Sequence, residues 1–149
     1  MPRIAVTSRS FSRHPILRQE LLDIYPEARF NESGASLAGD HLIEFLKGAE
    51  RAITALETFD DTVLAKLPAL KVISKYGVGI DMLDLEAMDK RGVKLGWTGG
   101  VNRHAVAELT LMMMIALLHR VPEALKDVGA GNWQQIKGRQ LTDKTIGII

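Results

Sequence analysis

The sequence predicts a doubly wound α/β sheet, with parallel strands in the middle and helices on both faces. Short runs rich in β-branched and apolar residues alternate with longer stretches whose apolar residues recur at helical spacing. Each run is separated from the next by enough residues for a crossover helix, which parallel strands require. The 149 residues are 46% hydrophobic and 25% charged, which is typical of a globular chain with a core.

The expected elements follow one another in a regular order. Strands are predicted at residues 3–7, 28–30, 51–55, 70–74 and 93–96, and the fourth of these carries Leu70, Val72 and Ile73, as a largely buried strand should. Helices are predicted at residues 15–25, 39–47, 61–67 and 84–90, and the last three are ended by Gly48, Pro68 and Gly92. One long helix is expected from about residue 102 to about residue 129, and a final strand at residues 144–149.

Right-handed crossovers would make this sheet flavodoxin-like. Ligands of such sheets bind beyond the carboxyl ends of the strands. Functional residues are therefore expected in the loops after Thr7, Ala55, Ser74 and Gly96.

Composition excludes several classes of protein. A net charge of +1 argues against a nucleic-acid binder that works through a strong basic field. The absence of cysteine excludes disulfides, thiolate zinc sites and cysteine nucleophiles, and it fits a reducing cytoplasm. The longest apolar run is eight residues, 111–118, whereas a bilayer helix needs about 18 or more, so no membrane association is expected.

The loop after the fourth strand is the strongest candidate for a binding site. Gly77 and Gly79 flank Val78 and let backbone N–H groups approach a ligand closely, so this turn suits a carboxylate, and Lys75 adds a positive charge. We expect Gly79 in particular to need glycine. The alternative is a tight strand-to-helix turn with Asp81 or Asp84 as the helix N-cap.

The long helix offers two further candidate residues. Asn102 is placed to cap its N-terminus, to hydrogen-bond a substrate with its amide, or to do both. Thr110 is one of few polar residues in the apolar stretch, and its hydroxyl is placed to bond the carbonyl four residues earlier. Because residues 106–118 are apolar on nearly every face, the helix needs a second domain or a second subunit to cover it.

The residues 70–87, LKVISKYGVGIDMLDLEA, resemble the signature region of the D-isomer-specific 2-hydroxyacid dehydrogenases, the phosphoglycerate dehydrogenase-like family. Asn102 and the stretch 106–111 resemble the interdomain helix of that family, and residues 131–133 and 141–149 resemble its approach to the nucleotide domain. The resemblance extends from about residue 69 to the end.

The resemblance implies an NAD(P)-dependent, two-domain oxidoreductase that acts on a 2-hydroxy or 2-oxo acid and dimerises through residues 106–118. In that family the turn matching Gly77, Val78 and Gly79 holds the substrate carboxylate, the residue matching Asn102 lies beside the substrate, and the position of Thr110 approaches the nicotinamide.

The resemblance also implies a division of the chain. Residues 1–101 would form the substrate domain, residues 102–130 the interdomain and dimerisation helix, and residues 131–149 the first strand of a Rossmann domain that binds NAD or NADP. We expect the sequence to continue in the natural protein, because residues 141–149 have the pattern of a turn and the start of a buried strand, with no turn or helix after it. The catalytic arginine, glutamate and histidine of the family match nothing here. On this interpretation the fragment itself is inactive.

Two alternatives remain open. One is a non-enzymatic, NAD-sensing relative of these dehydrogenases. The other is a flavodoxin-like binding module, whose flavin phosphate would sit on the hydroxyl-rich loop at residues 7–12, although that loop lacks the usual glycine. A receiver-type signalling module is excluded because the first strand ends without the acidic residues that hold Mg²⁺.

Overall fold

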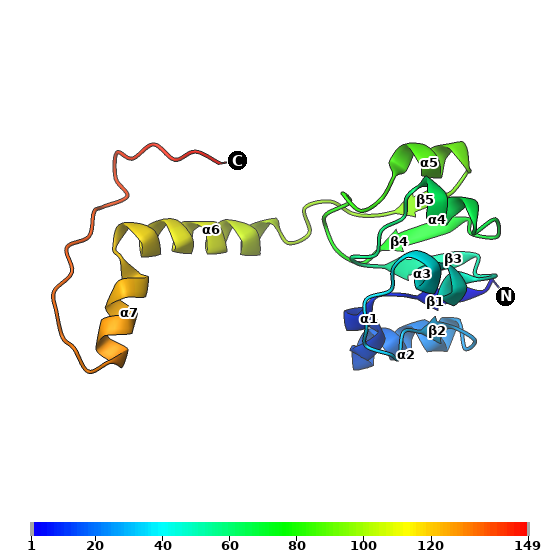
Figure 1. The fold of residues 1–149 in the computed structure, drawn as a ribbon, viewed down its shortest axis with the longest axis horizontal. Helices are drawn as coiled ribbons and strands as arrows, with labels where there is room; N and C mark the ends of the chain where they lie inside the picture. Colours follow the sequence, from blue (N-terminus) through cyan, green and yellow to red (C-terminus); the bar gives the residue numbers. More distant parts are fainter. Residues whose placement is uncertain (1, 149) are drawn as a thin grey trace. The chain divides into compact units, whose positions relative to one another are not determined.

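The computed structural model describes residues 2–148 and contains a five-stranded, wholly parallel sheet (Figure 1). The strand order is β2-β1-β3-β4-β5, which is the flavodoxin-like order and confirms the predicted fold class. The strands are β1 (Ile4–Val6), β2 (Arg29–Phe30), β3 (Arg51–Thr54), β4 (Val72–Lys75) and β5 (Lys94–Gly96).

Three helices share one core with the sheet. They are α3 (Gly39–Leu46), α4 (Asp61–Ala65) and α5 (Leu85–Lys90). The sheet side of this core consists of Ala5, Ala52 and Ile73, all with no exposed surface. The connections from β2 to β3, from β3 to β4 and from β4 to β5 all run in the same direction across the sheet. Right-handed crossovers therefore place the helices of these connections on the same face.

The other face of the sheet carries α2 (Pro15–Ile24), because the crossover from β1 to β2 runs in the opposite direction. This layer is thin. No residue of α2 is buried, and the isoleucines at its two ends, Ile16 and Ile24, are 62% and 63% exposed.

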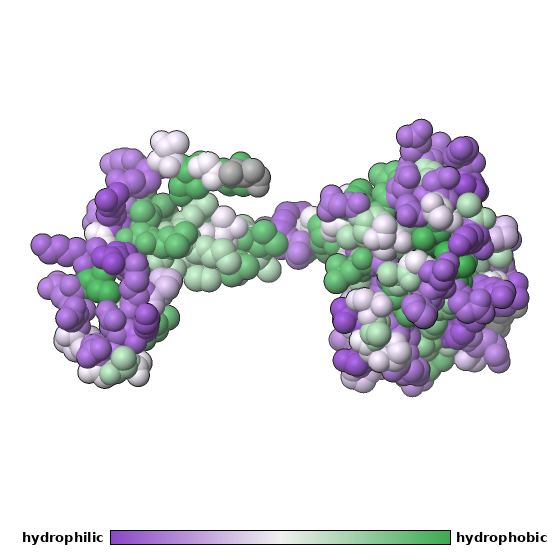
Figure 2. Space-filling view, viewed as in Figure 1, coloured by the Kyte–Doolittle hydropathy of each residue, from purple (hydrophilic) through white to green (hydrophobic). Residues whose placement is uncertain are grey.

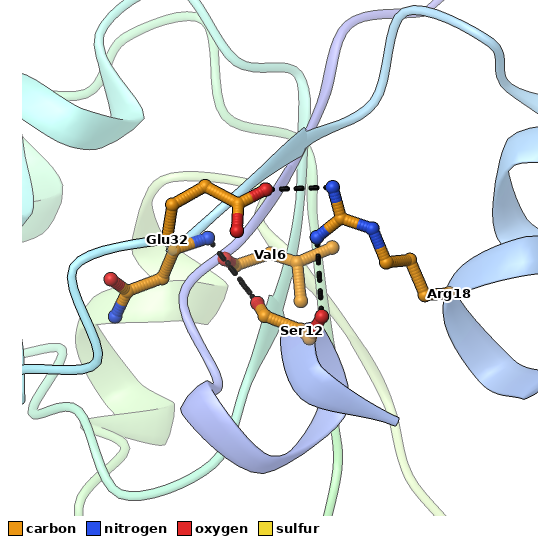
Figure 3. Close-up of polar contacts among 5 residues, drawn as sticks. Val6, Ser12, Arg18 and Glu32 are labelled. Carbon is orange, nitrogen blue, oxygen red and sulfur yellow. Dashed lines mark hydrogen bonds and ion pairs between the residues drawn. The ribbon is translucent and has the colours of Figure 1, made fainter. Parts of the chain in front are cut away.

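A short helix that the sequence did not predict, α1 (Arg9–Arg13), follows β1 directly. Its N-cap is Ser8, whose hydroxyl accepts a hydrogen bond from Phe11 N–H at 3.3 Å. Arg18 of α2 connects the end of α1 to the loop after β2, because it donates to the Ser12 carbonyl at 3.2 Å and pairs with Glu32 at 2.6 Å (Figure 3).

The chain divides after Val101 into two compact units. The second unit contains α6 (Arg103–Leu118) and α7 (Val121–Gly129), two helices bent by 69° at the break between them. The single long helix predicted for this region is therefore wrong. Arg120 at the break has a left-handed backbone with φ of 53°, and Pro122 follows in the first turn of α7.

Residues 144–148 form no strand, so the predicted final strand is wrong for these residues, and Ile149 lies outside the described part of the chain. A strand needs a neighbour with which to pair its backbone, and no other strand occurs among the described residues after Gly96. The preceding stretch contacts α6 instead, where Arg139 N–H donates to the Leu118 carbonyl at 2.9 Å.

The apolar side chains of α6 lie at the surface of its unit, and none of its residues is buried (Figure 2). Among the large hydrophobic side chains of this helix, the largest exposed fractions belong to Leu117, at 72%, and to Leu111 and Met113, at 52% each. Among residues 2–148, no single helix meets the length and hydropathy of a membrane span, and only the bent pair α6 and α7 meets them jointly.

Candidate functional site

The glycine-rich turn leaves the carboxyl end of β4 at the edge of the sheet where all five parallel strands end. Gly77 has a φ of 137°, which side chains rarely tolerate, and a Cβ there would lie 3.1 Å from the Lys75 Nζ. Gly79 has no positive φ, and a Cβ there would meet only the Asp81 carboxylate, at 3.5 Å. The conformational need for glycine that we expected at Gly79 therefore belongs to Gly77.

Contacts from three sides fix this turn. The Trp97 indole N–H donates to the Val78 carbonyl at 2.9 Å, and the Tyr76 N–H donates to the Thr54 carbonyl at 2.7 Å. The Tyr76 ring also meets Phe11 of α1 edge to face, with ring centroids 5.3 Å apart. The turn is thus held in place by β3, by α1 and by the loop after β5.

The far end of the turn runs into α5, and Asp84 is the N-cap of that helix. Its carboxylate accepts from Ala87 N–H at 2.9 Å, so Asp84 and not Asp81 caps the helix. Phe59 and Leu83 form a parallel bridge just before it. The turn therefore serves as a strand-to-helix connection whether or not a ligand binds to it.

Lys75 points back toward β3 and donates a hydrogen bond from Nζ to the Ala55 carbonyl. Partial burial lowers the pKa of Lys75 below its ordinary value, and the negative charge of Glu57 opposes that shift. The ammonium group therefore lies beside Gly77, with a neighbouring charge that favours its protonated form.

Glu57 is a member of this edge that the sequence did not single out. Its side chain is buried, and Oε2 accepts from Thr54 Oγ1 at 2.7 Å, Ala55 N–H at 2.9 Å and Thr7 Oγ1 at 3.1 Å. Burial alone would raise the pKa of Glu57, but the hydrogen bonds from Ala55, Thr54 and Thr7 outweigh it and lower the pKa. The parallel register of β1 and β3 brings Thr7 beside the end of β3, a contact across 50 residues that no local pattern signals.

An open pocket of about 220 Å³ lies at the same edge of the sheet. Its lining comes from the first turn after β1 and from the loop after β3: Ser8, Arg9, Ser10, Arg13, Ala55, Leu56 and Glu57. Because Ala55 also accepts the hydrogen bond from Lys75, the pocket adjoins the glycine-rich turn.

The structure brings Lys75, Gly77, Val78 and Gly79 together in one turn, whereas Asn102 and Thr110 belong to the second unit. Asn102 occupies the N-cap position of α6, and its carbonyl accepts from Val106 N–H at 3.0 Å. Its side chain makes no capping hydrogen bond, so the structure does not show the side-chain cap that was one alternative for this residue. Thr110 donates to the Val106 carbonyl at 2.7 Å, which confirms the local bond expected for it.

Comparison with known proteins gives the class of this chain. The family described as D-isomer specific 2-hydroxyacid dehydrogenase, catalytic domain, matches residues 4–146, nearly the whole chain. The chain belongs to this family, and its five-stranded parallel unit is the corresponding fold.

Particular relatives agree with this assignment. D-3-phosphoglycerate dehydrogenase of Methanocaldococcus jannaschii is 31% identical over 136 residues, which cover 89% of this chain and 26% of that protein. Human glyoxylate reductase/hydroxypyruvate reductase is 41% identical over 85 residues, covering 54% of this chain and 26% of that protein.

Solved structures show the same fold. A D-isomer specific 2-hydroxyacid dehydrogenase described as NAD-binding, from a Polaromonas species, superposes with a TM-score of 0.76 and 26% identity over 96% of this chain and 43% of that one. The NAD⁺-bound 3-phosphoglycerate dehydrogenase of Entamoeba histolytica gives a TM-score of 0.71 and 25% identity over 96% of this chain and 44% of that one. The chain thus spans about a quarter of the two curated relatives and less than half of these two structures.

Proposed function

We propose that this chain is the substrate-binding part of an NAD(P)-dependent oxidoreductase that interconverts a D-2-hydroxy acid and its 2-oxo acid. The observation that carries the proposal is the turn between β4 and α5, a rigidly held run of backbone with glycine at two of its positions and an ammonium group beside it. Membership of the dehydrogenase family supports the reaction class.

The chemistry of this turn suits a carboxylate. Backbone N–H groups at Gly77, Val78 and Gly79 are the proposed donors, and Lys75 supplies the positive charge that an anionic substrate needs. The Trp97 and Tyr76 contacts hold the turn in advance, so little ordering is lost when the substrate binds.

The cofactor would be held mainly outside this chain. When bound, the nicotinamide carries the hydride to or from the substrate carbon. Among residues 2–148 no glycine-rich loop joins a strand after β5 to a helix, so the described residues do not form a dinucleotide cradle. Thr110 is the proposed neighbour of the nicotinamide, and Asn102 the proposed neighbour of the substrate.

We also propose that two copies of the chain associate through residues 106–118. This stretch of α6 exposes large aliphatic and methionine side chains along its whole length. An apolar surface of this extent on a folded chain marks an interaction site. A second copy of the same helix is the proposed partner.

The proposal is tested by measuring hydride transfer in two samples. The chain of 149 residues, incubated with NADH and glyoxylate, hydroxypyruvate or phosphohydroxypyruvate, should show no turnover above a buffer blank. The whole protein to which the chain belongs should reduce at least one of these 2-oxo acids, and its Gly77→Val variant should show a raised KM for the 2-oxo acid with an unchanged affinity for NADH.

Three results would contradict the proposal. Turnover by the chain alone would overturn its inactivity. A whole protein that binds NADH but reduces no 2-oxo acid would favour the NAD-sensing alternative. An unchanged KM in Gly77→Val would move the substrate carboxylate away from the glycine-rich turn.

A further inference from the structure

We infer that Glu57 is a positioning residue for the substrate carboxylate, acting through Ala55 on the Lys75 ammonium beside the glycine-rich turn. The inference deepens the proposed function and rests on it. Its physical content is a coupling between two side chains, Glu57 and Lys75, that is measurable in this chain without any turnover.

The carboxylate of Glu57 lies in an unusual, buried environment. Its side chain is only 5% exposed, and burying an ionised group is costly unless other groups compensate it. Two hydroxyl groups and one backbone N–H, from Thr7, Thr54 and Ala55, all converge on the same oxygen, Oε2. None of the ion pairs found among residues 2–148 involves Glu57, so hydrogen bonds hold its charge in place.

Ala55 connects this carboxylate to Lys75. Its N–H donates to Glu57, and its carbonyl accepts from the Lys75 Nζ, so both ends of the residue are fixed. Thr54 is also paired with Lys75 in the register of β3 and β4. A shift of the loop after β3 would therefore move the ammonium group relative to Gly77.

If the role of Glu57 were purely structural, a neutral glutamine would suffice, because its amide oxygen can also accept hydrogen bonds from hydroxyl groups and an N–H. What only a carboxylate adds is negative charge near a partly buried ammonium group. That charge favours the protonated form of Lys75, which is the form that attracts an anionic substrate. Other charged groups face the pair: Arg9 and Arg13 of α1 line the pocket with Glu57, and Asp81 lies in the turn.

The first experiment measures the pKa of the Lys75 ammonium by NMR in the chain labelled at lysine. Glu57→Gln should lower this pKa by about half a unit or more, because the neutral amide no longer favours the charged ammonium. Glu50→Gln is the matched control. It removes the same charge just before β3, at the amino ends of the strands, where Glu50 pairs with Lys71 at 3.4 Å. An unchanged Lys75 pKa in Glu57→Gln, or equal shifts in both variants, would overturn the inference.

A reciprocal measurement avoids dependence on the folding of Glu57→Gln. Lys75 is half-exposed at the sheet edge, so Lys75→Met preserves the core. Linkage requires that this variant raise the pKa of the Glu57 carboxyl by as much as the charge of Glu57 raises that of Lys75. A Glu57 carboxyl that titrates identically with and without Lys75 would overturn the coupling.

The third measurement separates the inference from the proposed function. In the whole protein, Glu57→Gln should raise the KM for the 2-oxo acid about threefold or more, increasingly toward alkaline pH, with a smaller change in kcat and in the KM for NADH. Turnover with an unchanged KM would overturn the role of Glu57 alone. A whole protein that reduces no 2-oxo acid would overturn the proposed function, while the coupling measured in the chain would still stand.

Discussion

Gly77 and Gly79 are two residues apart and chemically identical, yet the backbone makes different demands on them. Gly77→Ala places a side chain at a φ of 137° and 3.1 Å from the Lys75 Nζ, whereas Gly79→Ala adds only an ordinary contact. We expect Gly77→Ala to lower the free energy of unfolding by about 1–3 kcal/mol and Gly79→Ala to change it by less than about 0.5 kcal/mol. Urea denaturation of both variants tests this, and equal losses would contradict it.

Glu57 should also give the fold a dependence on acid pH. Its pKa in the folded chain lies below the ordinary value of 4.5, so the unfolded chain binds more protons between the two values. The stability contributed by Glu57 is therefore complete above about pH 4.5 and is lost as the pH falls through the folded-state pKa.

Urea midpoints measured between pH 7 and pH 3 should therefore fall less steeply for Glu57→Gln than for the unchanged chain. Identical slopes would show that the carboxyl titrates alike in both states. Glu57→Gln is also expected to be less stable than the unchanged chain at pH 7, because an amide is a weaker acceptor than a carboxylate for the same donors.

Sequence reasoning found the candidate site only in part, for a physical reason. Lys75 and the glycines are adjacent in the chain, so a local pattern shows them. Glu57 acquires its role from Thr7 and Lys75, which only the pairing of β1, β3 and β4 brings to it. The Ser8 cap of α1 was a readable signal, but five residues are too few to display helical spacing.

Among the helices and strands, α6 gives the clearest prediction, which concerns dimerisation. Met113 and Leu117 are one helical turn apart and are 52% and 72% exposed. We expect the unchanged chain to be a dimer and the double variant Met113→Asp/Leu117→Asp to be a monomer, because two charges would be buried in the interface without partners. Light scattering on a sizing column measures the mass directly.

A matched control is Gln135→Asp, which adds a charge in an exposed stretch without regular structure and should leave the dimer intact. A monomeric unchanged chain would contradict the proposed association. Dimers that survive in the double variant would move the interface away from α6.

Helix boundaries were harder to predict than helix positions. The break between α6 and α7 falls at Arg120, just after the apolar run 111–118 ends, and the visible signals were the polar pair His119 and Arg120 and the proline at position 122. The strand expected at residues 144–149 had the right composition but no pairing partner among the described residues. Composition predicts what a segment favours, whereas a strand exists only when another strand accepts its hydrogen bonds.

At the scale of the whole molecule, the sheet was predictable because short apolar runs alternate regularly with helical segments. Few sheet topologies are compatible with that alternation. Right-handed crossovers then decide on which face of the sheet each helix lies. The structure confirms the flavodoxin-like arrangement and adds what the spacing of apolar runs does not contain, namely the length of each strand, from two residues in β2 to four in β3 and β4.

The two faces of this sheet differ in how well they are covered, and that difference should govern how the molecule opens. The core under α3, α4 and α5 contains fully buried side chains such as Leu42, Phe59 and Ile73, whereas α2 buries none. Backbone amides of α2 and of the two-residue strand β2 should therefore exchange with deuterium through local opening, before those of β3 and β4, which should wait for global unfolding. Uniform exchange rates across the sheet would show instead that β2 and the central strands β3 and β4 form one cooperative unit.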